Sequence, residues 1–359
     1  MSWTEGVLED LVQLQRGFDI TKAQQKPGNI PVISSSGPQS FHSEAKAKGP
    51  GVIIGRKGSL GTVYYSGSDY WPHDTTLWSK DLKGNDPKYV AYFLQTMNLA
   101  RFDTGNSNPT LNRNHIHGQP IRIPDLPTQE RIAGVLSAYD DLIENNRRRI
   151  ALLEQSARLL YREWFVHFRF PGHETAQFVD GLPEGWKMVR VEDAVTRHPP
   201  GKLYSQKTVA ETGAVPVLDQ GQSGIIGYHN EEPSFIAGID DPVIVFSNHT
   251  CYQRVIHFSF SAIQNVLPFK PSDRLPDQIY WLHHATEGLV TLNAYKGHWP
   301  EFKNKEFAVP TEGLAQIFNV YARDMHLQVN TLRQEVNQLA KARDLILPRL
   351  MDGRLSVQE

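Results

Sequence analysis

The sequence lacks most of the features that identify secreted, membrane-spanning or catalytic proteins. Its 359 residues include one cysteine, Cys251, so neither an intramolecular disulfide nor a cysteine-based metal knuckle can form. Apolar runs stay shorter than the roughly 18 residues that span a bilayer, and the first residues lack the pattern of a signal peptide. These absences predict a folded protein of the reducing cytoplasm, outside any membrane.

An excess of positive charge is also missing. The chain has 37 Lys and Arg against 39 Asp and Glu, which gives a net charge of −2. Residues 1–127 hold 13 basic and 11 acidic side chains, whereas residues 171–310 hold 11 basic and 16 acidic ones. The overall charge therefore gives no support to a strongly basic nucleic-acid-binding protein.

Catalytic and metal-binding motifs are missing as well. The sequence has no P-loop, no G-x-S-x-G elbow and no H-E-x-x-H pair. Histidines cluster at 73–74, 115–117 and 283–284 without acidic residues at ligand spacing, so we interpret them as exposed or hydrogen-bonded side chains. The stretches 108–111 and 198–201 depart from the tetrapeptide of adenine methyltransferases. We therefore expect no catalytic residues, no metal and no cofactor on this chain.

The sequence does contain one long internal repeat. Trp3 returns as Trp186, and IPVI at 30–33 returns as VPVL at 215–218. The longest matching segments lie at the end of each copy, displaced by 186 residues. The chain is therefore predicted to be a tandem duplication.

Each copy ends in apolar residues at alternating steps of three and four, which predicts two long helices with a coiled-coil seam. We expect Thr128 to cap the first helix and 171–172 to end it, with Pro348 and Gly353 ending the second. The two seams are expected to pair, although each helix could instead pack only on its own domain. Asn146 is either a buried amide that fixes the register or a residue at an exposed turn. The predicted seam consists of Ile132, Leu136, Tyr139, Ile143, Asn146, Ile150, Leu153, Leu160, Val329, Leu332, Val336, Leu339 and Ile346.

The stretches before each helix are rich in Gly, Pro, Ser and Asn, with short apolar runs such as 52–54 and 243–246. This pattern is typical of irregular β-rich domains. The predicted class is α+β, with two such domains separated by two long antiparallel helices in a pseudo-two-fold duplication. The predicted segments are a first domain at 1–127, a helix at 128–170, a second domain at 171–310, a helix at 311–352 and a tail at 353–359.

Two loops have residues that suit nucleic acid. Residues 55–61 (GRKGSLG) form a basic glycine-rich loop between two predicted strands, which could bring backbone N–H groups and two cations to a phosphate. Residues 103–113 are dense in side-chain amides, which can read adenine edges. Turn chemistry explains both loops equally well, so neither is specific alone.

Four further stretches, taken in their order along the chain, point more specifically to one protein family. They are 123–132 (from IP to PTQERI), 152–172 (LLEQSARLLYREWFVHFRFPG), 182–186 (LPEGW) and 347–353 (LPRLMDG). Together with IGRKGSLG and DTGNSNPTLN, they resemble the DNA specificity subunit of type I restriction-modification systems. The resemblance extends over the whole chain.

The resemblance implies a non-catalytic subunit of a DNA methylation and phage-defence complex. Two target recognition domains would each read one half of a split DNA sequence, and the helices would set the gap and dock two methyltransferase subunits. Restriction/translocase subunits would join that core, and S-adenosylmethionine, ATP and Mg²⁺ would bind to the partners. Two alternatives are a duplicated coiled-coil scaffold that binds only protein and a DNA-modifying enzyme with an unrecognised site.

The second domain departs from the first, because residues 246–254 (FSNHTCYQR) replace the basic glycine-rich loop. We place candidate DNA contacts on polar, basic and aromatic side chains of the loops in both domains. They are Ser35, Ser36, Arg56, Lys57, Ser59, His73, Asn106, Asn108, Arg113, Lys202, Tyr204, Gln220, Gln222, Asn248, His249, Lys296, His298 and Trp299.

Overall fold

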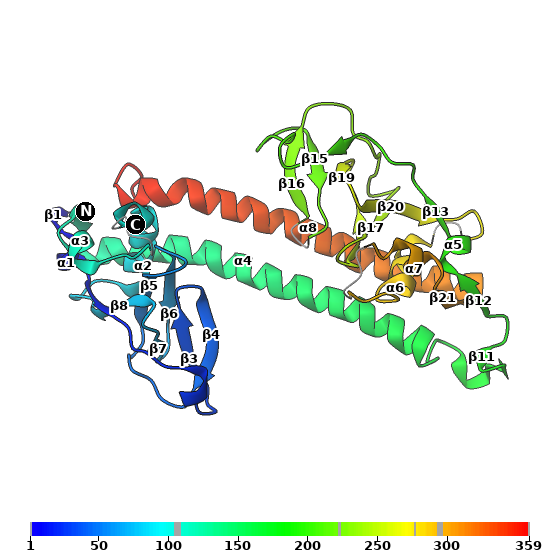
Figure 1. The fold of residues 1–359 in the computed structure, drawn as a ribbon, viewed down its shortest axis with the longest axis horizontal. Coiled ribbons are helices and arrows are strands. Elements are labelled where there is room, and N and C mark those ends of the chain that lie inside the picture. The colour runs from blue at the N-terminus through cyan, green and yellow to red at the C-terminus, as the bar shows by residue number, and fades with distance from the viewer. Residues whose placement is uncertain (1, 104–108, 222–223, 276–277, 293–296, 358–359) are drawn as a thin grey trace. The chain divides into compact units, whose positions relative to one another are not determined.

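The computed structural model describes residues 2–103, 109–221, 224–275, 278–292 and 297–357 (Figure 1). The chain divides into two compact units. Unit 1 comprises Met1–Asn145 and Val336–Glu359, and unit 2 comprises Asn146–Glu335. Both long helices therefore belong partly to each unit, whereas the sequence-based boundaries treat each helix as a segment of its own.

Unit 1 contains a four-stranded sheet of order β2-β8-β5-β6, a three-stranded sheet of order β4-β3-β7 and the pair β1-β9. Its elements are β1 (Trp3–Val7), α1 (Leu8–Leu11), β2 (Gln13–Arg16), η1 (Lys22–Gln24), β3 (Ile30–Ser34), β4 (Gly37–His42), β5 (Gly51–Gly55), β6 (Val63–Ser66), β7 (Trp71–Pro72), β8 (Thr76–Asp81), α2 (Pro87–Thr96), η2 (Leu99–Phe102), α3 (Arg113–His117) and β9 (Pro120–Pro124).

Unit 2 contains four-stranded sheets of order β13-β20-β17-β18 and β14-β19-β15-β16, with the pairs β12-β21 and β10-β11. Its elements are the π-helical turn Arg162–Val166, η4 (His173–Thr175), β10 (Phe178–Val179), β11 (Leu182–Pro183), β12 (Lys187–Arg190), α5 (Val191–Ala194), β13 (Val195–Arg197), β14 (Leu203–Tyr204), β15 (Val215–Leu218), β16 (Ile225–His229), β17 (Val243–Ser247), β18 (Gln253–Ile256), β19 (Ser261–Ile263), β20 (Val266–Pro271), α6 (Ile279–Thr286), α7 (Trp299–Lys303) and β21 (Glu306–Val309).

The topology repeats between the units, which confirms the predicted α+β duplication. The order β2-β8-β5-β6 in unit 1 has the same connectivity as β13-β20-β17-β18 in unit 2. In the second sheet of each unit a parallel pair recurs, with Val32 opposite Trp71 and Val217 opposite Ser261. Helix α6 accordingly occupies the place in unit 2 that α2 occupies in unit 1.

The central strand of each unit explains where the cores form. All five residues of β5 (GVIIG) and of β17 (VIVFS) are buried. Such continuous β-branched and aromatic runs suit a strand that has a partner on either side and is covered on both faces. Helices α2 and α6 add aromatic side chains to the cores, among them the fully buried Tyr89 and Trp281.

Two long helices complete both units, α4 (Leu126–Tyr161) and α8 (Glu312–Met351). They are antiparallel in each unit. In unit 1, Arg343 of α8 pairs with Asp140 of α4 at 2.5 Å. In unit 2, Arg333 pairs with Glu154 at 2.6 Å. Within unit 2, Asn146 pairs with Glu335 and Glu154 with Arg333, so the residue number on α8 falls as that on α4 rises, which confirms the predicted antiparallel arrangement.

The seam residues lie between the helices and the domains, and none of them is exposed. Those buried are Ile132, Leu136, Ile143, Asn146, Val329 and Leu332, and those half-buried are Tyr139, Ile150, Leu153, Leu160, Val336, Leu339 and Ile346. Asn146 is 5% exposed, and its side-chain amide donates to Glu335 at 3.0 Å. Of the two roles weighed for Asn146, the structure supports the buried amide.

The helix ends differ from those predicted. Helix α4 begins at Leu126, and Asp125 accepts the Thr128 backbone N–H at 3.1 Å, so Asp125 rather than Thr128 acts as the cap. The α-helix ends at Tyr161 and continues as a π-helical turn, well before residues 171–172. Pro348 lies inside α8 and does not end it. Among the described residues, no helix is both long and apolar enough to cross a membrane.

Candidate nucleic-acid interface

Six of the candidate residues of unit 1 meet where three loops come together. We call residues 34–37, 55–62 and 73–76 the first loop cluster. Thr75 joins these loops, because its carbonyl accepts the backbone N–H groups of Arg56 and Lys57 and its hydroxyl accepts that of Ser35. Thr62 closes the cluster by donating to the Ser35 carbonyl at 2.8 Å. The candidates in this cluster are Ser35, Ser36, Arg56, Lys57, Ser59 and His73.

The members of the first loop cluster differ in what they present to solvent. Lys57, Ser36 and Ser59 are exposed, whereas Ser35 is 6% exposed and contributes mainly its backbone. His73 is half-buried, and its Nδ1 lies 3.0 Å from the Thr75 hydroxyl. The exposed tip of the cluster therefore presents one cation and two hydroxyls. The hydrogen bonds to Thr75 hold the loops that carry them.

Arg56 differs from its neighbour Lys57. Its guanidinium is partly buried, and one terminal nitrogen is buried without a hydrogen-bond partner among the described residues. Burial lowers the pKa of Arg56, and the nearby Arg16 guanidinium adds to that effect. Asp74 acts in the opposite direction and pairs with Arg16 at 2.9 Å. Arg56 thus remains a cation with unused donor capacity beside the loop tip.

A groove of about 1240 Å³ also lies on unit 1, and sequence reasoning missed most of it. Its charged lining includes Arg16, Lys46, Lys80 and Arg113 together with three acids, so cations are in slight excess. Arg113 is the one candidate among them, and its guanidinium reaches the Leu14 carbonyl at 3.5 Å. The other three come from separate strands and loops that only the folded sheets bring together, so no local motif could have revealed them.

Unit 2 has a corresponding cluster with different chemistry. We call residues 219–221, 248–252 and 297–299 the second loop cluster. The Gln220 side chain accepts the His249 backbone N–H at 2.8 Å, and its amide lies 3.3 Å from the His249 ring. Asn248 accepts the backbone N–H groups of His298 and Trp299, one through its carbonyl and one through its side chain. Three loops distant in sequence are thereby joined by amides and a histidine.

One candidate of the second loop cluster, His298, is a core residue, and another, Trp299, packs against the core. His298 has no exposed surface, and Trp299 is half-buried against Phe246 and Phe269 with ring centroids 5.9 and 6.0 Å apart. A DNA contact through the His298 side chain is incompatible with this position. The aromatic and imidazole groups that suggested an exposed reading loop instead fill the domain interior, which sequence alone could not distinguish. Of the other candidates in this cluster, His249 is exposed, and Gln220 and Asn248 are half-buried.

Lys202 and Tyr204 lie apart from the second loop cluster. Both interact with Glu231, Lys202 by an ion pair and Tyr204 by a hydrogen bond of 3.2 Å. Tyr204 is 7% exposed and stacks on His229 at 4.3 Å between centroids. The buried ring of Tyr204 is therefore a packing element here. The candidates Asn106, Asn108, Gln222 and Lys296 fall outside the described residues.

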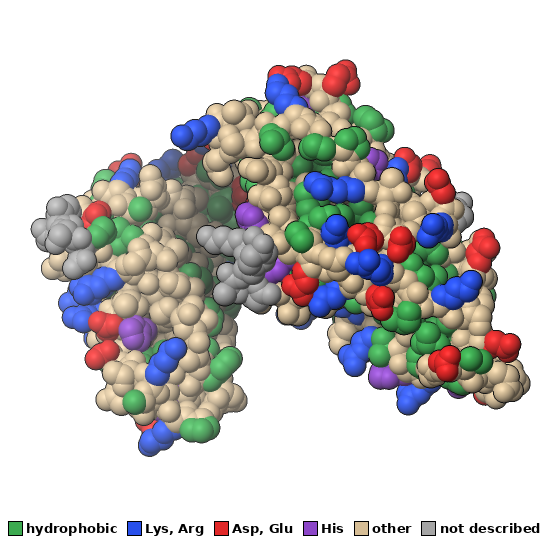
Figure 2. Space-filling model, turned by 45° about the vertical axis from the view of Figure 1, so that its right-hand side comes forward, with side chains coloured by type: hydrophobic (Ala, Val, Ile, Leu, Met, Phe, Trp, Pro, Cys, Tyr) green, Lys and Arg blue, Asp and Glu red, His purple; other side chains and the backbone are tan. Residues whose placement is uncertain are grey.

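Charge on the molecular surface agrees with the composition. On the face drawn in Figure 2, Lys and Arg side chains are interspersed with Asp and Glu. Two groups of side chains among the described residues could hold a metal ion, Asp19 with His73 and Asp74, and His283 with His284 and His326. In the first group, Asp74 is already paired with Arg16.

Comparisons with known proteins agree on one family. Residues 2–155 match the model of the type I restriction modification DNA specificity domain. The MjaIX specificity subunit of Methanocaldococcus jannaschii is 24% identical over 303 residues, which cover 76% of this chain and 70% of that protein. The HindI specificity subunit of Haemophilus influenzae is 31% identical over 100 residues, or 28% of this chain and 21% of that one.

The fold comparison extends over nearly the whole chain. The type I restriction-modification S subunit of M. genitalium superposes with a TM-score of 0.66, covering 98% of this chain and 96% of that one. At 14% identity this likeness concerns the fold alone. Specificity subunits are the non-catalytic members of these systems, and catalysis lies in other subunits. The chain is therefore similar to type I restriction-modification specificity subunits, through the family model over residues 2–155 and through sequence and fold over most of its length.

Proposed function

We propose that each unit's β-rich domain reads one half of a bipartite DNA target. The observation that carries this proposal is the duplication of one topology with two different sets of loop residues. A shared frame supports two equivalent readers, and the unlike loops, Lys57 with serines in one and Gln220 with His249 in the other, support unlike half-sites. In this proposal the domains approximate residues 1–127 and 171–310, with 128–170 and 311–352 as spacer helices.

The long helices are proposed to set the gap between the half-sites and to dock two methyltransferase subunits. Several large apolar side chains on α4 and α8 have more than two-fifths of their surface exposed. Exposed apolar groups of this kind favour a protein partner on the helices. They include Leu142, Leu152, Leu159, Val320 and Leu345. Restriction/translocase subunits would join the resulting core. We place S-adenosylmethionine, ATP and Mg²⁺ on those partners.

The test of separate reading is a genome-wide map of methylated adenines made with the rebuilt complex. One variant combines Ser36→Ala, Lys57→Ala and Ser59→Ala in the first loop cluster. The other combines Gln220→Ala and His249→Ala in the second loop cluster. Each variant should relax the motif in one half only, because each domain contacts its own half-site.

The controls are Lys22→Ala and Lys207→Ala, exposed lysines outside both clusters, which should leave the motif unchanged. Equal relaxation of both halves by either variant, with assembly intact, would contradict separate reading. Binding of S-adenosylmethionine by this chain alone would instead favour a DNA-modifying enzyme. Salt-insensitive or absent DNA binding by the full complex would favour the protein-only scaffold.

A further inference from the structure

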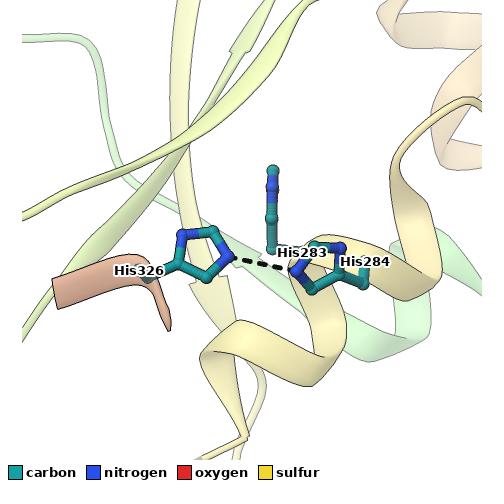
Figure 3. Close-up of side chains that lie close together, drawn as sticks. All are labelled: His283, His284 and His326. Atoms are coloured by element: carbon teal, nitrogen blue, oxygen red, sulfur yellow. Dashed lines mark hydrogen bonds between the residues drawn. The ribbon is translucent and has the colours of Figure 1, made fainter. Parts of the chain in front are cut away.

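Three histidines that the proposed function does not use lie together in unit 2, where α6 packs against α8 (Figure 3). His283 and His284 are neighbours on α6, and His326 comes from α8. One ring nitrogen of each lies within 4.8 Å of those of the others, and the Nε2 atoms of His284 and His326 are 3.1 Å apart. His283 and His284 are only 5% and 6% exposed.

The hydrogen bonding of this cluster is incomplete. The Nδ1 atoms of His283 and His284 are both buried without a hydrogen-bond partner among the described residues. Buried polar nitrogens that lack a partner carry a desolvation cost that folded proteins usually avoid. Nδ1 of His284 lies 3.8 Å from Glu287, which leaves Nδ1 of His283 as the nitrogen of this cluster that a bound component would satisfy.

The position in unit 1 that corresponds to His326 has different hydrogen-bond partners. His326 stands 186 residues after Asp140, the displacement that relates the two helix seams. Asp140 accepts a hydrogen bond of 2.5 Å from Tyr92 on α2 and pairs with Arg343. Unit 1 therefore closes this junction with complementary protein groups, whereas unit 2 presents imidazoles to one another.

We propose that His284, His326 and His283 form a binding site for a divalent transition-metal ion, for which Zn²⁺ is the best-suited probe. Imidazole nitrogen is a preferred ligand of Zn²⁺. With Zn–N bonds of about 2.0–2.1 Å, two ligands of a tetrahedral site lie roughly 3.3 Å apart, close to the His284–His326 spacing. His283 would approach by a small side-chain movement, and water would supply the fourth ligand. The ion would tie the second domain to α8.

The surrounding charges fit this role in part. Glu287 lies 3.8 Å from Nδ1 of His284, beyond hydrogen-bond distance, and a small side-chain movement would let this carboxylate orient a metal-binding imidazole. Burial lowers the pKa of His283 to about 4 and holds those of His284 and His326 well below the usual range. Arg158 is the opposing charge, since it also lowers the pKa values of His283 and His284.

The experiment uses the untagged full chain, because a histidine tag would itself bind metal. After chelator treatment, the protein is dialysed against Zn²⁺ and its metal content and affinity are measured. We expect one equivalent of Zn²⁺, a higher Tm with the ion than without it, and at least tenfold weaker binding by His284→Gln and by His326→Gln. Glu287→Gln should weaken binding about 10–100-fold. His115→Gln and His167→Gln, which change exposed histidines, are the controls.

A second measurement keeps the proposal testable if a histidine variant fails to fold. Co²⁺ bound to the wild-type chain should give the intense visible absorption of a tetrahedral site, and Zn²⁺ should abolish it by competition. The proposal is overturned if the wild-type chain holds no stoichiometric metal, if Co²⁺ gives only the weak octahedral spectrum, or if folded His284→Gln and His326→Gln retain wild-type affinity. DNA recognition does not depend on the outcome.

Discussion

Lys57 and Arg56 are adjacent cations of the glycine-rich loop, yet only Lys57 is exposed. If Lys57 contacts a DNA phosphate, Lys57→Ala weakens binding by the assembled complex to a similar degree on every sequence. The slope of log affinity against log salt should become shallower by about one unit. DNA titrations at several salt concentrations provide the measurement, with Lys22→Ala as the control. A loss of about 1–3 kcal/mol confined to one base position would identify a base contact instead.

Two buried tyrosines of α2 allow the contribution of one hydrogen bond to stability to be measured, because only one of the two hydroxyls has a partner among the described residues. The Tyr92 hydroxyl donates to the Asp140 carboxylate at 2.5 Å, and burial together with that carboxylate raises the Tyr92 pKa, which keeps the proton on the donor. Tyr92→Phe should lower the free energy of unfolding by about 1.5–3 kcal/mol, as for hydrogen bonds to charged groups.

Tyr89→Phe is the control for that prediction. Tyr89 is fully buried, and its hydroxyl has no hydrogen-bond partner among the described residues, so its removal should cost little or nothing. Urea unfolding of both variants measures the difference. Equal losses would show that packing rather than the Tyr92–Asp140 hydrogen bond determines the effect.

Sequence reasoning could single out part of the candidate site because the relevant chemistry is local. The motif GRKGSLG identified the loop tip, since its glycines and cations are contiguous. It could not identify the groove residues Arg16, Lys46 and Lys80, which the sheets assemble from distant positions. It also could not tell that His298 and Trp299 fill the core, because aromatic residues suit both an interior and an exposed loop. The three-histidine cluster was missed because His326 lies far along the chain from His283 and His284.

At the scale of elements, burial along α4 decides what each seam residue contributes. Leu136 has no exposed surface and packs in the unit 1 core, whereas Leu153 is half-buried in unit 2. Leu136→Ala should therefore lower the free energy of unfolding by about 2–5 kcal/mol, the range for a fully buried leucine. Leu153→Ala, the same chemical change, should cost clearly less. Denaturant unfolding of both variants gives the comparison, and equal losses would contradict a seam of uneven burial.

The long helices could be predicted because a 3.5-residue period appears directly in the sequence. Their ends could not, since Asp125 caps α4 only through tertiary context and α8 continues through Pro348 despite the lost backbone donor. The domains were predicted only as β-rich. Pairing of β3 with the distant β7, or of β15 with β19, depends on long-range contacts that leave no local pattern.

At the scale of the whole molecule, the helices are candidate determinants of half-site spacing. Helix α4 has 36 residues, or about 54 Å at 1.5 Å per residue. Seven residues inserted at matched points of α4 and α8 preserve the seam and add about 10 Å, equivalent to about three base pairs. The methylated motif should keep both halves and gain unspecified base pairs between them, with weaker binding because the added pairs rotate the distal half-site by about 100°.

Insertion of seven residues in α4 alone is the control, because it misaligns the antiparallel seam and should prevent assembly. The motif is read from methylated DNA in cells that carry the rebuilt complex. An active complex whose motif retains its original gap after the matched insertion would refute a spacing role for the helices.

The closing segment of unit 1 has a consequence for biosynthesis. Leu350 and Met351 of α8 belong to the same buried cluster as Leu8 and Ile132, and the turn at Gly353 lies against Trp3. The start of β1 and the end of α8 accordingly lie together within unit 1 (Figure 1). A ribosome therefore makes all of unit 2 before it delivers the segment that completes the core of unit 1. The domain translated first is the last to become fully native, and until then its unfilled apolar surface is a natural target for chaperones.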